Sequence, residues 1–188
     1  MPPIAGPPSP PKAPERIDTA RLELRRPTGA DAEAIFTTYA ADPEVTPYVG
    51  FPRHLTIEAT RAFLGFCDAQ WATWPAGPYL IRRRDTGELI GSSGVMFETP
   101  YRAQTGYVLA RHAWGHGYAT EALSAMTALA RDCGVRRLYA ICHHAHRPSA
   151  RVLEKGGFSL EGVLRQYAEF PNLEPVGPYD CLCYAVTF

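Results

Sequence analysis

The decisive stretch of this chain is Arg111-His-Ala-Trp-Gly-His-Gly-Tyr-Ala-Thr-Glu-Ala122, which joins a predicted strand to a predicted helix. The bulky residues Tyr107, Val108 and Leu109 before it indicate a short strand. After it, apolar residues recur at helical spacing over about four turns, and Gly134 ends that pattern. The helix is thus predicted along its length and at its C-terminal end.

The N-terminus of this helix carries two glycines. Gly115 and Gly117 flank His116, where the first helical N–H groups have no partner inside the helix. Without side chains a ligand can approach this backbone closely, and the helix end favours an anion such as a phosphate. A tight turn with no ligand explains two glycines equally well, because a lone pair of glycines is a weak signal. A phosphate site therefore needs a second observation.

A second strand–turn–helix unit follows the first. Its pattern predicts a buried strand at Leu138–Cys142, a polar turn at His143–Ser149, and a short helix at Ala150–Lys155 before Gly156 and Gly157. Two such units in succession predict neighbouring strands whose turns open at one edge of the sheet. That edge is where α/β proteins usually hold their ligand.

These motifs resemble those of the GNAT superfamily of N-acetyltransferases. Trp114–Ala119 is similar to the pyrophosphate-binding signature of the ribosomal-protein N-terminal acetyltransferase branch, and Thr120–Leu123 continues it in the same way. Ser149–Phe158 resembles the second family signature, and Glu161–Arg165 resembles the strand after it. The likeness covers roughly residues 17–188, and two ordered motifs at compatible spacing are more specific than either alone.

The resemblance implies a single α/β domain over residues 16–188. Its sheet would be mixed and mostly antiparallel, with a parallel pair at the cofactor cleft and about four flanking helices. It also implies acetyl-CoA as co-substrate and no metal. The residues it assigns to cofactor binding are Val108, Leu109, Ala110, Trp114, Gly115, His116, Gly117, Tyr118, Ala119, Thr120, His146 and Ser149. Among them, the backbone N–H groups of Val108–Ala110 would stabilise the oxyanion, and Ser149 would protonate the leaving sulfur. Ser149 has a plainer interpretation too, as a first-turn helix residue.

Two positions depart from the family pattern. His146 stands where the family usually has Asn three residues before the serine, and His is a poor helix cap. Gln104 stands where related proteins often carry Glu, and an amide cannot take a proton. Both departures keep open a second class of function, an acyl-CoA-binding regulator that has lost turnover. A third possibility is that only the fold was kept.

Acetyl transfer requires a neutral amine and a group that takes its proton. At pH 7 a lysine amine is neutral in about one molecule in two thousand, and an α-amine in roughly a tenth. Glu98 is the predicted proton acceptor, directly or through water, with His54 and His146 behind it; a solvated loop carboxylate explains Glu98 equally well. The acceptor is either a protein N-terminus or a small amine. The resemblance makes four loop residues candidates for contact with it, although solvated loop residues are the simpler explanation: Tyr48, Phe51, Arg53 and His54.

Composition excludes several kinds of partner. The 188 residues are 46% hydrophobic, enough for one core, and nineteen basic residues balance nineteen acidic ones. No net field therefore favours nucleic acid or an anionic membrane. Five cysteines show no disulfide or ligand spacing, which indicates a reduced, cytoplasmic protein. The sequence leaves open whether the protein is a monomer or a homodimer. His143, His144 and His146 lack an accompanying cysteine pair, so a zinc site is disfavoured.

The remaining predictions concern the N-terminal tail, membrane spans and the other strands and helices. Residues 1–15 contain seven prolines and no apolar period, which predicts a disordered or polyproline-like tail without the apolar run of a signal peptide. No later stretch reaches the roughly eighteen apolar residues of a membrane span. The other predicted elements are strands at 21–25, 79–84, 89–96, 158–167 and 180–188, a helix from a Thr28–Asp31 capping box to about residue 42, a helix after Thr56, and a polar turn at 97–102.

Overall fold

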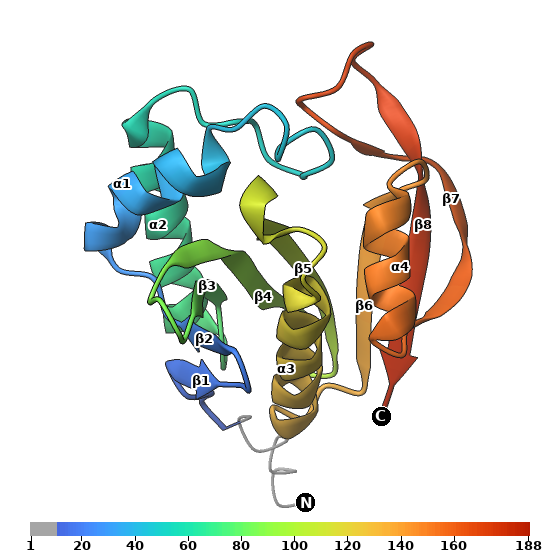
Figure 1. Cartoon of the computed structure of the whole chain (residues 1–188). Helices are drawn as coiled ribbons and strands as arrows, with labels where there is room; N and C mark the ends of the chain where they lie inside the picture. Colours follow the sequence, from blue (N-terminus) through green and yellow to red (C-terminus); the bar gives the residue numbers. More distant parts are fainter. Residues whose placement is uncertain (1–10) are drawn as a thin grey trace, which may run out of the picture.

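The computed structural model describes residues 11–188, in which helices cover both faces of one sheet (Figure 1). Within these residues the elements are β1 (Arg16–Asp18), β2 (Leu22–Arg25), η1 (Gly29–Asp31), α1 (Ala32–Ile35), η2 (Phe36–Ala40), α2 (Ile57–Thr73), β3 (Pro78–Arg83), β4 (Leu89–Thr99), β5 (Arg102–Leu109), η3 (Arg111–Ala113), α3 (Tyr118–Asp132), β6 (Arg137–His143), α4 (Arg147–Lys155), β7 (Ser159–Glu169) and β8 (Pro178–Thr187). The sheet order is β1-β2-β3-β4-β5-β6-β8-β7, and in this described part only β5 and β6 are parallel neighbours. The predicted mixed sheet with one parallel pair and four α-helices is confirmed.

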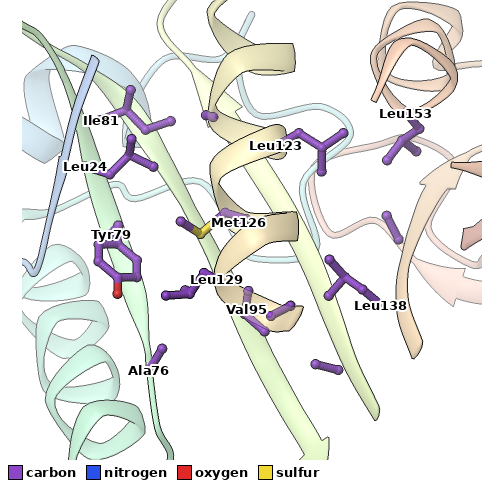
Figure 2. Close-up of a cluster of buried hydrophobic side chains, with 14 of the residues drawn as sticks. Leu24, Ala76, Tyr79, Ile81, Val95, Leu123, Met126, Leu129, Leu138 and Leu153 are labelled. Atoms are coloured by element: carbon purple, nitrogen blue, oxygen red, sulfur yellow. The ribbon is translucent and has the colours of Figure 1, made fainter. Parts of the chain in front are cut away.

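The predicted apolar stripe of α3 packs on one face of the sheet. Leu123, Met126 and Leu129 are buried against strand residues such as Val95 and Leu138 (Figure 2). Burying each such side chain contributes roughly 1.5–3 kcal/mol. This stripe therefore fixes how α3 lies on the sheet, and with it the position of the turn that precedes the helix.

The helical segment before residue 42 covers the other face, together with α2. Its first turn begins at the predicted Thr28–Asp31 box, where the Asp31 carboxylate accepts hydrogen bonds from the Thr28 N–H at 2.8 Å and from the Thr28 hydroxyl at 2.9 Å. The path then runs through η1, α1 and the π-turn η2 to Ala40, so the predicted helix is present as three short pieces. Ile35 and Leu64 are buried there against Leu80 of β3.

The parallel pair opens part-way along its length. β5 and β6 are paired at Arg102–Arg137, Ala103–Leu138 and Gln104–Tyr139. β5 continues to Leu109 and β6 to His143, without further pairing between them. Beyond Gln104 and Tyr139 the facing backbone edges of the two strands are therefore unpaired, and this separation of the two backbones, called the opening below, lies next to the start of α3 (Figure 1).

The turn predicted at 97–102 was too long. β4 extends to Thr99 and β5 begins at Arg102, so Glu98 lies in a strand and the turn is confined to Pro100 and Tyr101. The polar composition of this stretch suggested a loop. In the structure, continued pairing of β4 with β5 at Phe97–Ala103 and Thr99–Arg102 overrides that preference.

Ordered chain also begins earlier than residue 16. Ala13 donates its N–H to the Pro75 carbonyl at 2.9 Å, and the Tyr79 hydroxyl donates to the Pro14 carbonyl at 2.7 Å. Proline lacks an N–H but keeps its carbonyl, so residues 11–15 find partners on the domain despite their composition. The rest of the tail predicted over residues 1–15, residues 1–10, lies outside the described residues.

Candidate active site

The turn before α3 has the backbone of an anion cradle. Gly115 and Gly117 have φ of 78° and 80°, in the left-handed region that glycine adopts without strain. A Cβ on Gly115 would meet nothing within 4 Å, so its backbone borders open space. Glu121 makes the first bond of the helix, from its N–H to the Gly117 carbonyl at 3.1 Å. Before it, the N–H groups of residues 115–120 have no acceptor in the described chain, and they lie at the positive end of α3. These groups fit a diphosphate.

A clamp from the start of the chain holds this turn. Arg21 donates from Nη1 to the His116 carbonyl at 2.9 Å and from Nε to Glu121 at 2.7 Å. The second oxygen of Glu121 accepts from the Arg21 N–H at 2.8 Å and from the Thr19 hydroxyl at 2.6 Å. Burial alone would raise the pKa of Glu121, but these bonds outweigh it and lower the pKa, so the carboxylate stays charged. Sequence reasoning missed this clamp because its halves are 100 and 102 residues apart.

The side chains of the turn fold back on their own segment. The Trp114 indole donates to the Leu109 carbonyl at 2.7 Å, which closes the end of β5. The His116 ring stacks on Tyr118 with centroids 5.7 Å apart, and the Arg21 guanidinium lies 4.7 Å from the Tyr118 centroid. Ala119 and Thr120 form the first helical turn, both partly exposed. The aromatic residues therefore shape the turn and leave its N–H groups free.

The three backbone positions predicted to stabilise an oxyanion are not equivalent. Ala110 already donates its N–H to the Ile90 carbonyl at 2.9 Å. N–H groups alternate between the two edges of a strand, so Val108 also faces β4 and Leu109 faces the opening toward β6. Of the three, Leu109 has the N–H directed at the opening.

Ser149 lies in the first turn of α4 beside β5. Its Oγ is 3.0 Å from the Tyr107 hydroxyl, which also donates to the Ser149 carbonyl at 3.1 Å. A phenol has one proton, so when Tyr107 donates to the carbonyl, the Ser149 hydroxyl is the donor to Tyr107. Burial raises the pKa of Tyr107, and the phenol stays neutral. The sequence identified Tyr107 only as a bulky strand residue, because its partner comes from another element.

Glu98 lies at the closed end of the β5–β6 pair. It accepts a hydrogen bond from Arg102 Nε at 2.5 Å and another from the Tyr139 hydroxyl. Burial, and then the bond to Glu98, raises the pKa of Tyr139. Glu98 follows Phe97, which pairs with Ala103 of β5. Ser149 contacts Tyr107, which lies four residues farther along the same strand, and four strand residues span about 13 Å. The predicted role of Glu98 as proton acceptor thus requires a chain of several water molecules between it and an amine near Ser149, because one water spans only a single hydrogen-bond step.

His146 forms no side-chain cap, yet α4 begins directly after it. The helix has Pro148 in its first turn, which presets the backbone and explains the start without a cap. The His146 ring instead stacks on Tyr48, with centroids 4.6 Å apart. Burial, and then the neighbouring His143, lowers the pKa of His146, so its imidazole is neutral at pH 7. This contact joins the predicted cofactor side to the predicted acceptor side.

The loop between η2 and α2 brings the four predicted acceptor residues to the same end of the sheet. The Phe51 ring lies 5.6 Å from that of His54, which is buried and 2.8 Å from the Thr60 hydroxyl through Nδ1. Burial lowers the pKa of His54. This pairing makes His54 a structural residue of the loop rather than an exposed base.

Asn172, which sequence reasoning missed, ties that loop to the β7–β8 loop. Its Nδ2 donates to the carbonyls of Thr46 at 2.8 Å and Phe51 at 2.9 Å, and its Oδ1 accepts the Arg53 N–H at 2.7 Å. Figure 1 shows these two loops approaching each other above the ends of β5 and β6. No local pattern marks Asn172, since its partners are 119 to 126 residues away.

Neither a metal-binding cluster nor a helix able to span a membrane is found in the described part of the chain. Residues 11–188 contain no group of three or more His, Cys, Asp or Glu arranged to hold a metal ion. Among the helices of this part, none combines the length and apolar character needed to cross a membrane.

Comparison with known proteins now identifies the family. Residues 21–159 match the family described as Acetyltransferase (GNAT) domain. The chain belongs to the GNAT acetyltransferase family. This GNAT chain is 35% identical over 173 residues to "Uncharacterized N-acetyltransferase YoaA" of Bacillus subtilis (strain 168), over 90% of this chain and 95% of that protein. It is accordingly an acyltransferase, as its motifs predict.

Solved structures share the fold of this GNAT chain. The acetyltransferase (GNAT family) from Bacillus anthracis is 25% identical, with a TM-score of 0.78 over 92% of this chain and 98% of that one. RimL, described as ribosomal L7/L12 alpha-N-protein acetyltransferase in complex with coenzyme A, is 24% identical, with a TM-score of 0.80 over 93% and 98% of the two chains. At that identity the RimL match shows the fold alone. Two of these structural neighbours are described with a bound cofactor, RimL with coenzyme A and the microcin C7 self immunity acetyltransferase MccE with acetyl-CoA and AMP.

Proposed function

We propose that this GNAT protein transfers the acetyl group of acetyl-CoA to a primary amine by direct attack in a ternary complex. The observation that supports it most is the opening of the β5–β6 pair beyond Gln104 and Tyr139, next to the glycine turn. Such an opening beside a row of free N–H groups suits an extended carrier with a diphosphate at one end and a thioester at the other. The chemistry that acetyl-CoA supplies when bound is an activated acyl group on a thiol that leaves readily.

Binding is assigned to the turn and the strand edge. The N–H groups of residues 115–120 receive the diphosphate, while Trp114 and the Arg21 clamp keep the turn in shape. His146 lies beside the path of the carrier's arm at the start of α4. The neutral ring of His146 offers the polar contact that the family obtains from Asn.

The reaction itself needs two kinds of donor. The N–H of Leu109, directed at the opening, stabilises the negative oxygen that forms during attack. The Ser149 hydroxyl donates a proton to the leaving sulfur while Tyr107, its hydroxyl turned from the Ser149 carbonyl to Ser149 Oγ, passes on its own proton, which solvent then replaces. Because a thiol leaves without full protonation, this step needs only modest help.

Proton removal from the amine is assigned to Glu98 acting through water. The imidazole of His146, which lies nearer to Ser149 than Glu98 does, is the second candidate for this role. The acceptor lies along the loop that carries Tyr48, Phe51, Arg53 and His54, and it is a protein N-terminus or a small amine. We also propose that the protein works in the cytoplasm, as a monomer or homodimer, consistent with five free cysteines in the structure.

Mass spectrometry of acetylated products, together with coenzyme A release, tests this function across a panel of α-amines and alkylamines. Acetylation of at least one amine, dependent on acetyl-CoA, is the expected result. The second candidate, an acyl-CoA-binding regulator, is motivated by Gln104 and His146 in place of the usual Glu and Asn. Tight acetyl-CoA binding without product from any amine would favour the regulator. If calorimetry detects no acetyl-CoA binding, the protein has kept the fold of the family without its cofactor site.

A further inference from the structure

His143 has an unusual hydrogen-bonding state. It ends β6 and is 5% exposed. Its Nδ1 accepts the N–H of Ala145 at 3.1 Å, so in the neutral ring the proton is on Nε2. Burial, and then the neighbouring His144, lowers the pKa of His143, in agreement with a neutral imidazole. The ring therefore presents Nε2–H as a donor and has no free lone pair with which to act as a base.

That donor has no partner. Nε2 of His143 is buried and reaches no hydrogen-bond acceptor within residues 11–188. Aromatic rings surround it: those of Tyr48, Phe170 and Tyr179 have centroids 5.0 Å from the imidazole, and His144 lies at 4.5 Å. Buried donors without acceptors are rare in folded proteins, and each calls for an explanation such as a ligand that completes it.

The position of His143 indicates which ligand. Side chains alternate along β6, and Cys142 belongs to the core on the side of α3 and α4, so His143 points to the opposite side of the sheet. It stands at the wide end of the β5–β6 opening. The rings against it come from the loop with Tyr48 and from the start and end of the β7–β8 connection, at Phe170 and Tyr179. These are the walls of the proposed acceptor site.

We propose that His143 is a specificity-determining residue whose Nε2–H binds a neutral carbonyl oxygen beside the acceptor amine. This inference rests on the proposed acetyl transfer. The substrate class is an amine followed by a carbonyl, as in α-amino amides, α-amino esters and peptide N-termini. Alkylamines and polyamines lack this oxygen, and a carboxylate would be buried against a neutral ring without a counter-charge. Tyr48 is the partly exposed ring of this contact, so it is the ring that would have to shift for the acceptor carbonyl to reach Nε2.

A matched pair of acceptors tests the assignment. Phenylalaninamide and phenethylamine share the aromatic group and differ in the carbonyl, and kcat/KM is measured for both with wild type, His143→Phe and His143→Gln. The two amines differ in basicity, so the measure is how their ratio changes between proteins. We expect His143→Phe to lower the amide-to-amine ratio about tenfold, the effect of one neutral hydrogen bond. His143→Gln, whose amide can donate, should restore part of the ratio.

Controls separate this role from packing and from the reaction itself. Coenzyme A affinity and thermal unfolding are measured for each variant, and His144→Phe, a change in the exposed neighbouring ring, should leave the ratio unaltered. An equal ratio in wild type and His143→Phe would overturn the proposal and leave Nε2–H in contact with aromatic rings only. If no amine is acetylated, the proposed function fails. The assignment of His143 is then decided by calorimetry of the two ligands in the presence of coenzyme A, where the same loss of amide preference supports it and its absence refutes it.

Discussion

The diphosphate-binding part of the cofactor side is built from one continuous stretch, residues 109–120, which Arg21 braces, whereas the acceptor side is assembled from the η2–α2 loop, the end of β6 and the β7–β8 loop. On the cofactor side, backbone N–H groups do the binding, and glycine, helix end and strand end follow one another in sequence. On the acceptor side, side-chain rings and one amide hold together segments far apart in the chain, with the partners of Asn172 lying 119 to 126 residues away from it. The first side is suited to one constant ligand, and the second can change its specificity through single residues.

The largest expected effect comes from Gly117→Arg, which fills the cradle with a side chain. Coenzyme A affinity measured by calorimetry should fall at least about a hundredfold, because the N–H groups are blocked and φ of 80° is unfavourable for arginine.

Gly134→Arg is the matched control for that variant. Gly134 ends the same helix with φ of 83°, and a Cβ at this residue would meet nothing within 4 Å. The substitution therefore has the same backbone cost of about 1–2 kcal/mol without touching the cradle. Equal loss of coenzyme A binding in the two variants would show that strain, not the cradle, explains the effect.

Ser149→Ala should lower kcat about ten- to thirtyfold. This loss is smaller than a general acid usually contributes to the rate, because a thiol leaves without full protonation. The affinity for coenzyme A should change less than about threefold, because the variant loses only one hydroxyl near the sulfur. Stopped-flow measurement of thiol release and calorimetry distinguish the two quantities. A loss of binding as large as the loss of turnover would contradict a division of roles between the turn and Ser149.

Glu121→Ala tests whether the clamp shapes the cradle. Three hydrogen bonds to Glu121 are lost and the Arg21 side chain that also holds the His116 carbonyl loses its anchor, so coenzyme A affinity should fall about tenfold and the free energy of unfolding by about 1–3 kcal/mol. Because the folded pKa of Glu121 is lowered, its stabilisation is complete above the unfolded value of about 4.3 and is lost as pH falls through the folded value. Urea unfolding of the two proteins should therefore converge at low pH.

Glu161→Ala removes a different carboxylate–arginine pair and serves as the control. The side chains of Arg137 and Glu161 are 34% and 42% exposed, so solvent screens this pair and its loss should change stability little. A similar fall in coenzyme A affinity in both variants would show that the clamp has no special relation to the turn.

The same contrast explains what the sequence could predict. The mixed sheet, α3 with its buried stripe and the glycine turn follow from local periodicity and from glycine's φ preference, so they were predictable. Tyr107, Arg21 and Asn172 were not, because each acts through a partner that only the folded chain brings near. The polar neighbours of Glu98 predicted a loop at this residue. In the structure, Glu98 belongs to β4, at the closed end of the β5–β6 pair and away from Ser149.

Asn172→Ala should have the smallest effect and should act on the acceptor side alone. Removing the amide frees the Thr46 and Phe51 carbonyls and the Arg53 N–H, so the two loops lose their link. We expect the acceptor KM to rise about threefold to tenfold, with coenzyme A affinity unchanged, because the cradle shares no hydrogen bond with these loops. Asn172→Asp keeps the oxygen that accepts the Arg53 N–H but replaces the donor to the two carbonyls with an acceptor, and it should impair the acceptor KM at least as much as alanine. If both variants weaken coenzyme A and acceptor equally, the two sides of the site are energetically coupled, and the Tyr48–His146 stack and the Arg111–Glu44 ion pair are contacts through which that coupling would pass.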